Sequence, residues 1–200
     1  MTYITTYLGN KVDLINPTPD MIDIVDIAHH LAQINRYVGA ARFPYSVAQH
    51  SFLMSHMVSQ ENALTALLHD ATEAYLGDIS YPLKSLLPDY RAVEDKFWRV
   101  IATKFGLPHE MPAEVKRADT LIRNAEKNAL FLNSPDWHEV DSDEFVMPEV
   151  YPMSFTRAEL SFRKRWLDLC DINNNKHKEV VYEGNGKSRL QEIREDKRVA

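Results

Sequence analysis

The sequence predicts an all-α helical bundle with a small N-terminal β-hairpin. Apolar residues recur at helical spacing over most of the chain, from about residue 20 to residue 169. Before that stretch, β-branched and aromatic residues flank the turn signal Gly9-Asn10 between Tyr3 and Leu14, which is typical of a hairpin. The chain has 200 residues, of which 44% are hydrophobic. This is enough for one domain with an apolar core.

Capping residues, glycines and prolines divide the helical region into segments. Ser46 is a favourable N-cap, whereas Gly77 and Gly106 are typical helix stops. The expected helices run over about residues 20–34, 47–58, 61–75, 90–105, 112–132 and 156–169, with a single turn within 82–87. From Asp171 the chain turns polar. We therefore expect one domain over residues 1–170 and a mobile polar tail, with at most a weak helix, over residues 171–200.

Composition excludes several classes of protein. The net charge of −6 argues against nucleic acid as a partner, although a small phosphorylated ligand stays possible. Cys170 is the single cysteine, so no internal disulfide forms and a reducing, cytoplasmic location is expected. The stretch Met1-Thr2-Tyr3-Ile4 has no basic region typical of a signal peptide. No run approaches the roughly 20 apolar residues of a membrane span, so we expect no membrane partner.

The most informative stretch runs from Leu67 to Asp78. It places His69, Asp70 and Glu73 in a segment that otherwise reads as a helix. His69 and Glu73 are four residues apart, and Asp70 and Glu73 are three apart, so a helix brings them to one face. Converging polar groups at the edge of a core need a partner, and a divalent metal is the obvious candidate.

Two further residues complete a set of metal ligands. His50 lies in the helix after Ser46, and Asp119 lies in the helix that starts near residue 112. Together with His69 and Asp70 they would bring two imidazoles and two carboxylates into a bundle interior, as metal sites in helical bundles do. This donor set suits a divalent transition metal (Zn, Co or Mn, with Mg possible) better than Ca²⁺. Taken alone, the His69-Asp70 pair would more often lie on a solvated surface.

The order His50…His69-Asp70…Asp119 resembles the H…HD…D signature of HD-domain metal-dependent phosphohydrolases. The stretches 45–51 and 67–73 are similar to the segments around the first histidine and the HD pair in that family. The stretch 77–84 resembles the small 5′-deoxynucleotidase branch, which includes phage dATP triphosphohydrolases. The resemblance covers roughly residues 20 to 130 and implies an HD-domain helical bundle.

The resemblance also implies roles for individual side chains. His50, His69, Asp70 and Asp119 would bind the metal. Glu73 would act as general base or orient the water, and Asp78 would assist or donate a proton to the leaving oxygen.

Substrate contacts are implied by the same resemblance. The deoxynucleotidases carry an Arg-Trp pair upstream of the first histidine, where this chain has Arg36-Tyr37, one position nearer to His50. Arg36 would bind phosphate and Tyr37 would stack on the base. Independently of the resemblance, Lys84 and then Arg42 are expected at the phosphate, because they are basic residues near these motifs and a phosphate needs cationic partners.

The expected activity is metal-dependent hydrolysis of a 2′-deoxynucleotide at the α-phosphate. The favoured substrate is a deoxynucleoside triphosphate, dATP-like, which would give a deoxynucleoside and triphosphate. An alternative is a 5′-deoxynucleotidase acting on monophosphates. An alternative of another class is a non-catalytic HD module that binds nucleotide or metal, and a third is a purely structural bundle. Aromatic residues at helical spacing suit core or subunit contacts, and we expect a homo-oligomer, a dimer or higher.

Overall fold

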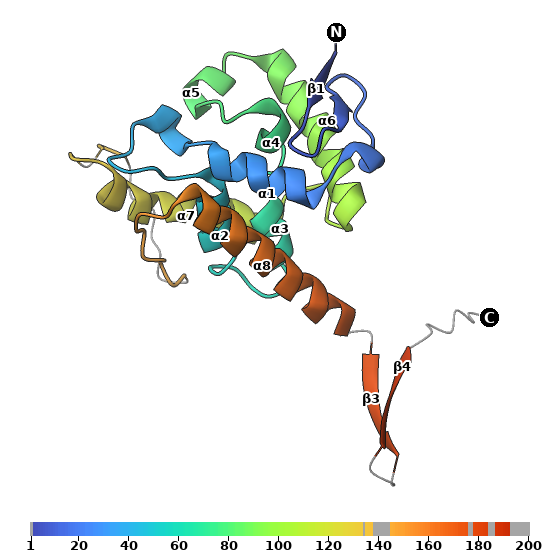
Figure 1. Ribbon diagram of the computed structural model, residues 1–200. Coiled ribbons are helices and arrows are strands. Elements are labelled where there is room, and N and C mark those ends of the chain that lie inside the picture. The colour runs from blue at the N-terminus through green and yellow to red at the C-terminus, as the bar shows by residue number, and fades with distance from the viewer. Residues whose placement is uncertain (1, 134, 138–144, 176–177, 184–186, 193–200) are drawn as a thin grey trace.

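A computed structural model describes residues 2–133, 135–137, 145–175, 178–183 and 187–192. Its described part is mostly helical, with a two-stranded antiparallel hairpin near the N-terminus formed by β1 (Tyr3–Thr5) and β2 (Lys11–Asp13) (Figure 1). The predicted combination of an all-α fold and an N-terminal hairpin is therefore confirmed. No helix of the described residues has the length and apolar character needed to cross a membrane.

The helices follow the expected order, and most begin and end within a few residues of the expected bounds. The α-helices are α1 (Ile24–Gln33), α2 (Val47–Met54), α3 (Ala63–Leu68), α4 (Glu73–Leu76), α5 (Tyr81–Lys84), α6 (Pro88–Phe105), α7 (Ala113–Leu130) and α8 (Phe155–Asn175), and two 3₁₀ helices are η1 (Pro19–Met21) and η2 (Arg36–Gly39). The α1 helix begins later than expected because the side chain of Asp23 caps it, accepting a hydrogen bond from Val25 N.

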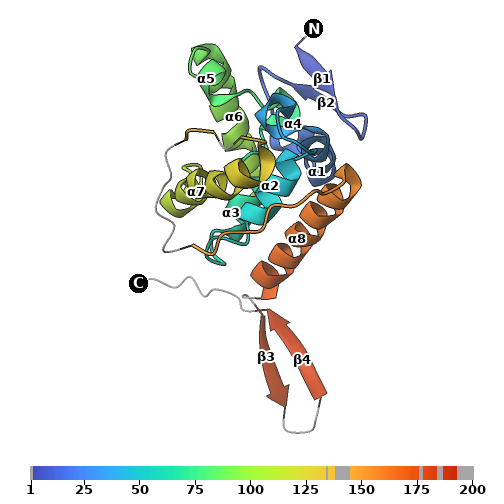
Figure 2. The ribbon, with the colours of Figure 1, turned by 90° about the vertical axis from the view of Figure 1, so that its left-hand side faces the viewer.

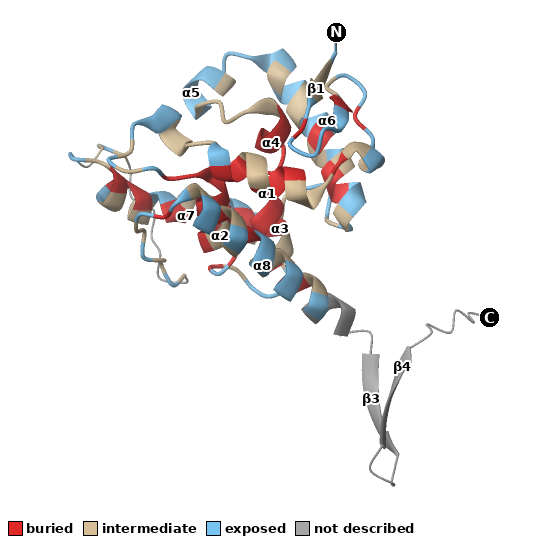
Figure 3. Ribbon diagram, viewed as in Figure 1, coloured by how far each residue is buried: buried red, intermediate tan, exposed pale blue. Residues whose placement is uncertain are grey.

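Helix α2 lies between two apolar clusters. On one side, Val47 and Ala48 pack into a cluster shared with α1, α3, α6 and α8. On the other side, Leu53 and Met54 pack against α7 through Leu121 and its neighbours. Figure 2 shows α8 and α7 on opposite sides of α2 and α3, and Figure 3 shows that the buried residues gather where these helices meet. The middle of α2 is therefore held rigidly at the centre of the molecule.

The N-terminal hairpin is attached to α1 by two polar side chains, Asp26 and His30. Asp26 is fully buried, and its Oδ1 accepts a hydrogen bond from Leu8 N at 2.8 Å. His30 accepts from Tyr7 N at 3.0 Å through Nε2 and donates to Ala74 O at 2.7 Å through Nδ1. Helix α1 therefore ties the hairpin to α4.

The expectation of one helix over residues 61–75 is wrong. Helix α3 ends at Leu68 and α4 begins at Glu73, and the bonds Ala71 N to Leu68 O and Glu73 N to Asp70 O join residues three apart. These are the tighter bonds of a 3₁₀ turn. The side chain of His69 contributes to this break, since its Nδ1 donates to Ala66 O at 2.8 Å. That carbonyl is the one an unbroken α-helix would use for the N–H of residue 70.

The predicted polar tail from residue 171, for which at most a weak helix was expected, contains regular structure in its described residues. Helix α8 continues to Asn175, and β3 (Lys178–Glu183) pairs with β4 (Lys187–Glu192) in an antiparallel hairpin. Polar composition alone suggested a tail without strands, but Val180-Val181-Tyr182 has high strand propensity.

Glu114, in the first turn of α7, ties this helix to the segment before α3. Its Oε1 accepts a hydrogen bond from Ser59 N at 2.8 Å, and its Oε2 accepts from Ser59 Oγ at 2.7 Å and from Asn62 Nδ2. Burial works to raise the pKa of Glu114, but these hydrogen bonds hold it below its usual value. The folded protein therefore stabilises the charged carboxylate.

We predict that Glu114→Gln lowers the free energy of unfolding by about 1 kcal/mol at pH 7, because charge-assisted hydrogen bonds are lost. Since the folded state depresses this pKa, the contribution is present above the usual value of 4.5 and disappears as the pH falls below it. Urea titrations at pH 7 and pH 3 measure the difference, with exposed Glu110→Gln as the control. An equal loss at both pH values would contradict the role of the charge.

Candidate metal centre

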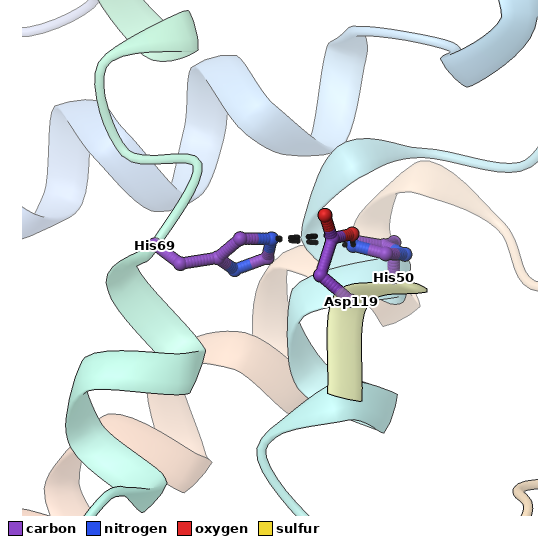
Figure 4. A group of neighbouring side chains, drawn as sticks. All are labelled: His50, His69 and Asp119. Carbon is purple, nitrogen blue, oxygen red and sulfur yellow. Dashed lines mark hydrogen bonds and ion pairs between the residues drawn. The ribbon is translucent and has the colours of Figure 1, made fainter. Parts of the chain in front are cut away.

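The predicted metal ligands come from α2, the end of α3 and α7. His50 occupies the middle of α2, and its side chain is 0% exposed. His69 is 7% exposed and follows the last residue of α3. Asp119 lies on α7, and its side chain is 45% exposed. Figure 4 shows the side chains of these residues pointing toward one another.

The ligand atoms lie within the reach of a single ion. The Nε2 atoms of His50 and His69 are 3.3 Å apart. Asp119 Oδ1 lies 3.4 Å from His50 Nε2 and 3.9 Å from His69 Nε2. Asp70 Oδ2 lies 3.1 Å from His69 Nε2 and 3.7 Å from His50 Nε2. Such separations fit ligands that share one cation at about 2.0–2.2 Å from each.

The hydrogen bonds on the far side of each imidazole decide which nitrogen faces the cluster. His69 Nδ1 donates to Ala66 O, and His50 Nδ1 donates to the carboxylate of Glu126 at 2.7 Å. In their neutral forms, both rings therefore turn an Nε2 lone pair toward the carboxylates of Asp70 and Asp119. Lone pairs and carboxylates that face one another repel unless a cation lies among them, so the donor set fits a divalent transition metal.

The electrostatic surroundings also favour positive charge at this point. Burial and the charge of Arg36 work to lower the pKa of His50, but Glu126 and Asp119 raise it to about 9. Burial works to raise the pKa of Asp70, but the two imidazoles and Arg36 hold it well below its usual value. Asp70 is therefore a carboxylate at neutral pH.

Arg36, which is expected at the phosphate from the sequence, lies beside the predicted ligand Asp70 in a turn of unusual backbone conformation. Its Nη1 donates to Asp70 Oδ2 at 3.3 Å, and its side chain is 12% exposed. The next two residues, Tyr37 and Val38, have φ of 58° and 55°, in the left-handed region. Such residues cost of order 1–2 kcal/mol each and are concentrated at functional sites.

A cavity of about 430 Å³ opens next to the ligands. It is lined by Arg36, Tyr37, Val38, Asp70, Glu73, Asp78, Ile79, Ser80, Tyr81, Pro82, Lys84, Asp119, Arg123 and Trp137. The sequence-predicted metal ligands Asp70 and Asp119 therefore share one cavity with both predicted acid–base residues. Its volume lies in the range of small-molecule sites.

Glu73 and Asp78 form a pair of carboxyl groups on this cavity. Glu73 is 5% exposed, and its Oε2 has no hydrogen-bond partner among the described residues. Burial raises the pKa of Glu73 well above its usual value, and the charges of Asp70 and Asp78 raise it further. Burial also raises the pKa of Asp78. These are properties of groups that accept and donate protons near neutral pH.

The two remaining predicted cations have different positions. Lys84 lines the cavity, and its Nζ forms an ion pair with Glu94 Oε1 at 2.7 Å. Arg42 lines a separate cavity of about 240 Å³, and its backbone N donates to Leu130 O. The structure therefore does not bring Arg42 together with the predicted metal ligands.

Sequence reasoning missed Arg123, Glu126 and Trp137. Arg123 and Glu126 follow Asp119 by four and seven residues on α7, so helical spacing could have indicated that all three share one face. Burial works to raise the pKa of Glu126, but Arg36 and His50 lower it to about 2. Trp137 lies in a segment without helical periodicity, and no signal in the sequence connects it with the site.

Comparison with known proteins gives relatives whose names state no activity. The chain is 40% identical over 176 residues to the uncharacterized protein YfdR of Escherichia coli strain K12, covering 86% of this chain and 98% of that protein. It is 40% identical over 120 residues to the uncharacterized protein RCAP_rcc00048 of Rhodobacter capsulatus, covering 55% of this chain and 61% of that protein. No protein-family model matches the chain.

We predict that His69→Ala weakens metal binding by roughly a hundredfold, because a ligand that faces three other donors is lost. The measurement is metal content by elemental analysis after equilibration with Mn²⁺, Co²⁺ or Zn²⁺ and gel filtration. Exposed His56→Ala is the control, since His56 lies outside the cluster. Equal metal contents in the two variants would contradict the site.

Proposed function

We propose that this chain, which belongs to the same family as Escherichia coli YfdR, is an HD-domain metal-dependent phosphohydrolase that cleaves 2′-deoxynucleotides at the α-phosphate. One observation carries the proposal. The cluster of His50, His69, Asp70 and Asp119 borders a cavity that is also lined by Glu73, a buried residue whose Oε2 has no hydrogen-bond partner in the described part of the chain. A cation site beside a base without a fixed partner is the arrangement that hydrolysis needs.

The wall of the cavity supports a nucleotide as substrate. The rings of Tyr37 and Trp137 are stacked with their centroids 5.6 Å apart, and Phe131 packs edge-on against both. Arg36, Lys84 and Arg123 supply cationic groups on the same cavity, and the Arg36 guanidinium lies 5.4 Å from the centre of the Tyr37 ring. Aromatic rings and cations that line the same cavity suit a ligand with a flat base and a phosphate group.

In the proposed reaction, Glu73 acts as the general base and Asp78 as the general acid. A bound divalent metal would supply Lewis-acid activation of the phosphate and of water. Glu73 takes a proton from the attacking water, and the water oxygen forms a bond to the α-phosphorus. The bond between that phosphorus and O5′ breaks, and Asp78 gives a proton to O5′. Arg36, beside Asp70, holds a phosphate oxygen.

The number of phosphates distinguishes two forms of this proposal. We favour a deoxynucleoside triphosphate, dATP-like, because several cationic side chains line the cavity. A monophosphate is the alternative, since Arg36 and Lys84 are already paired with Asp70 and Glu94. A non-catalytic nucleotide-binding module would not need a buried Glu73 oxygen that, among the residues the structure describes, has no hydrogen-bond partner.

We predict that the purified protein with Mn²⁺ or Co²⁺ converts a deoxynucleoside triphosphate into a deoxynucleoside and triphosphate, measured by chromatography of all deoxynucleoside mono-, di- and triphosphates. Glu73→Gln should retain the metal and lose kcat by about 10²–10⁴-fold, because it cannot accept the proton.

The matched control for this variant is Glu61→Gln, an exposed glutamate outside the cavity. Phosphate release from monophosphates alone would select the alternative substrate. Full activity of Glu73→Gln would remove Glu73 as the base, and no turnover of any nucleotide would reject the enzymatic proposal.

We also predict that Trp137→Ala raises KM for the substrate by roughly tenfold or more with a small change in kcat, because stacking on an aromatic side chain contributes about 1–3 kcal/mol per base. Trp137→Phe keeps an aromatic face and should recover most of the affinity. Steady-state kinetics of the two variants measure KM and kcat separately. A loss confined to kcat would contradict a role for Trp137 in base binding.

A further inference from the structure

Glu126 is a fully buried carboxylate on α7 that does not belong to the metal cluster itself. Its Oε1 accepts hydrogen bonds from His50 Nδ1 at 2.7 Å and from Tyr45 Oη at 2.9 Å. Its Oε2 accepts a hydrogen bond from Tyr37 Oη and lies 3.7 Å from Arg36 Nη2. A buried carboxylate needs such partners, and here they fix both of its oxygens.

The contact with His50 determines what that histidine can do. Glu126 binds Nδ1, on the side of the ring away from His69 and Asp119, whose ligand atoms face Nε2. The hydrogen bond therefore places the proton of the neutral ring on Nδ1 and leaves Nε2 as the donor atom. It also fixes the rotation of the ring about its side-chain bonds.

The partners of Glu126 connect this carboxylate with the cavity. The ring of Tyr37 lines the cavity, while its hydroxyl bonds to Glu126. Tyr45 is fully buried and holds the other oxygen from the segment that precedes α2. The carboxylate is thus oriented from the cavity wall and from the apolar interior at once.

We propose that Glu126 is a positioning residue that presents His50 Nε2 to the metal, with Tyr37 and Tyr45 fixing the carboxylate. The inference rests on the metal site of the proposed function. It assigns to Glu126 no contact with substrate. Its consequence is that metal affinity depends on a side chain that lies beyond the ligands.

The test is the affinity of the unliganded protein for Co²⁺ or Zn²⁺, measured by competition with a chelator. Glu126→Gln should bind the metal about 10–100-fold more weakly, because removing the partner of a ligating histidine has effects of this size. Tyr45→Phe, which removes one donor to Glu126 without touching His50, should bind the metal several-fold more weakly. Nitrogen NMR of the histidine-labelled, Zn²⁺-loaded protein should show a shifted His50 Nδ1 signal in Glu126→Gln, because a neutral amide accepts the Nδ1 proton more weakly than a carboxylate does.

Glu114→Gln is the matched control, since Glu114 is also a hydrogen-bonded carboxylate on α7 but contacts Ser59 and Asn62. It should lower stability and leave metal affinity unchanged, which separates positioning from general destabilisation.

Unchanged affinity in Glu126→Gln would overturn the inference and leave the proposed function intact. If Glu126→Gln does not fold, unchanged affinity in Tyr45→Phe would overturn it in the same way, and weaker binding would support it. A wild-type protein that takes up no metal would overturn both the inference and the proposed function.

Discussion

The structure depends on the burial of His50 between the carboxylate of Glu126 on one side and those of Asp70 and Asp119 on the other. Its Nδ1 is bonded to Glu126, and its Nε2 faces His69 and Asp119, so both nitrogens of a 0% exposed ring are partnered. Because the partners of His50 lie on α7 and at the end of α3, α2 must lie between these two helices. The two apolar clusters on either side of α2 make the position rigid, because close-packed side chains resist displacement.

Negative charge gathers at this point in a chain whose net charge is already −6. Arg36 is the nearest opposing cation, and it reaches both Asp70 and Glu126. The turn that follows Arg36 holds Tyr37 and Val38 in a strained backbone conformation. The hydroxyl of Tyr37 bonds to Glu126, so the same carboxylate that accepts from His50 also helps to hold the strained turn.

The sequence predicted the ligands and not their supports, for a physical reason. His69 and Asp70 are adjacent, and helical spacing predicted most helices and their apolar faces. Glu126 meets His50 across 76 residues, and before the fold is known it resembles any glutamate on a helix. Arg42 was expected at the phosphate because it is one of the basic residues nearest the motifs, but it lines another cavity, after η2. Proximity in the sequence was therefore a poor guide to which side chains surround the candidate metal centre.

Between α3 and α4 the backbone departs from the regular α-helix that the sequence pattern predicts, and this departure changes the arrangement of the site residues. In an unbroken α-helix, Glu73 would lie one turn from His69 on the same face. The tighter turn over residues 69–73 instead brings Asp70 and Glu73 toward an eclipsed arrangement, since side chains three apart align in a 3₁₀ turn. The charge of Asp70 then helps to raise the pKa of Glu73. The irregular turn thus places His69 and Asp70 in the cluster of proposed metal ligands and Glu73, the proposed base, beside it.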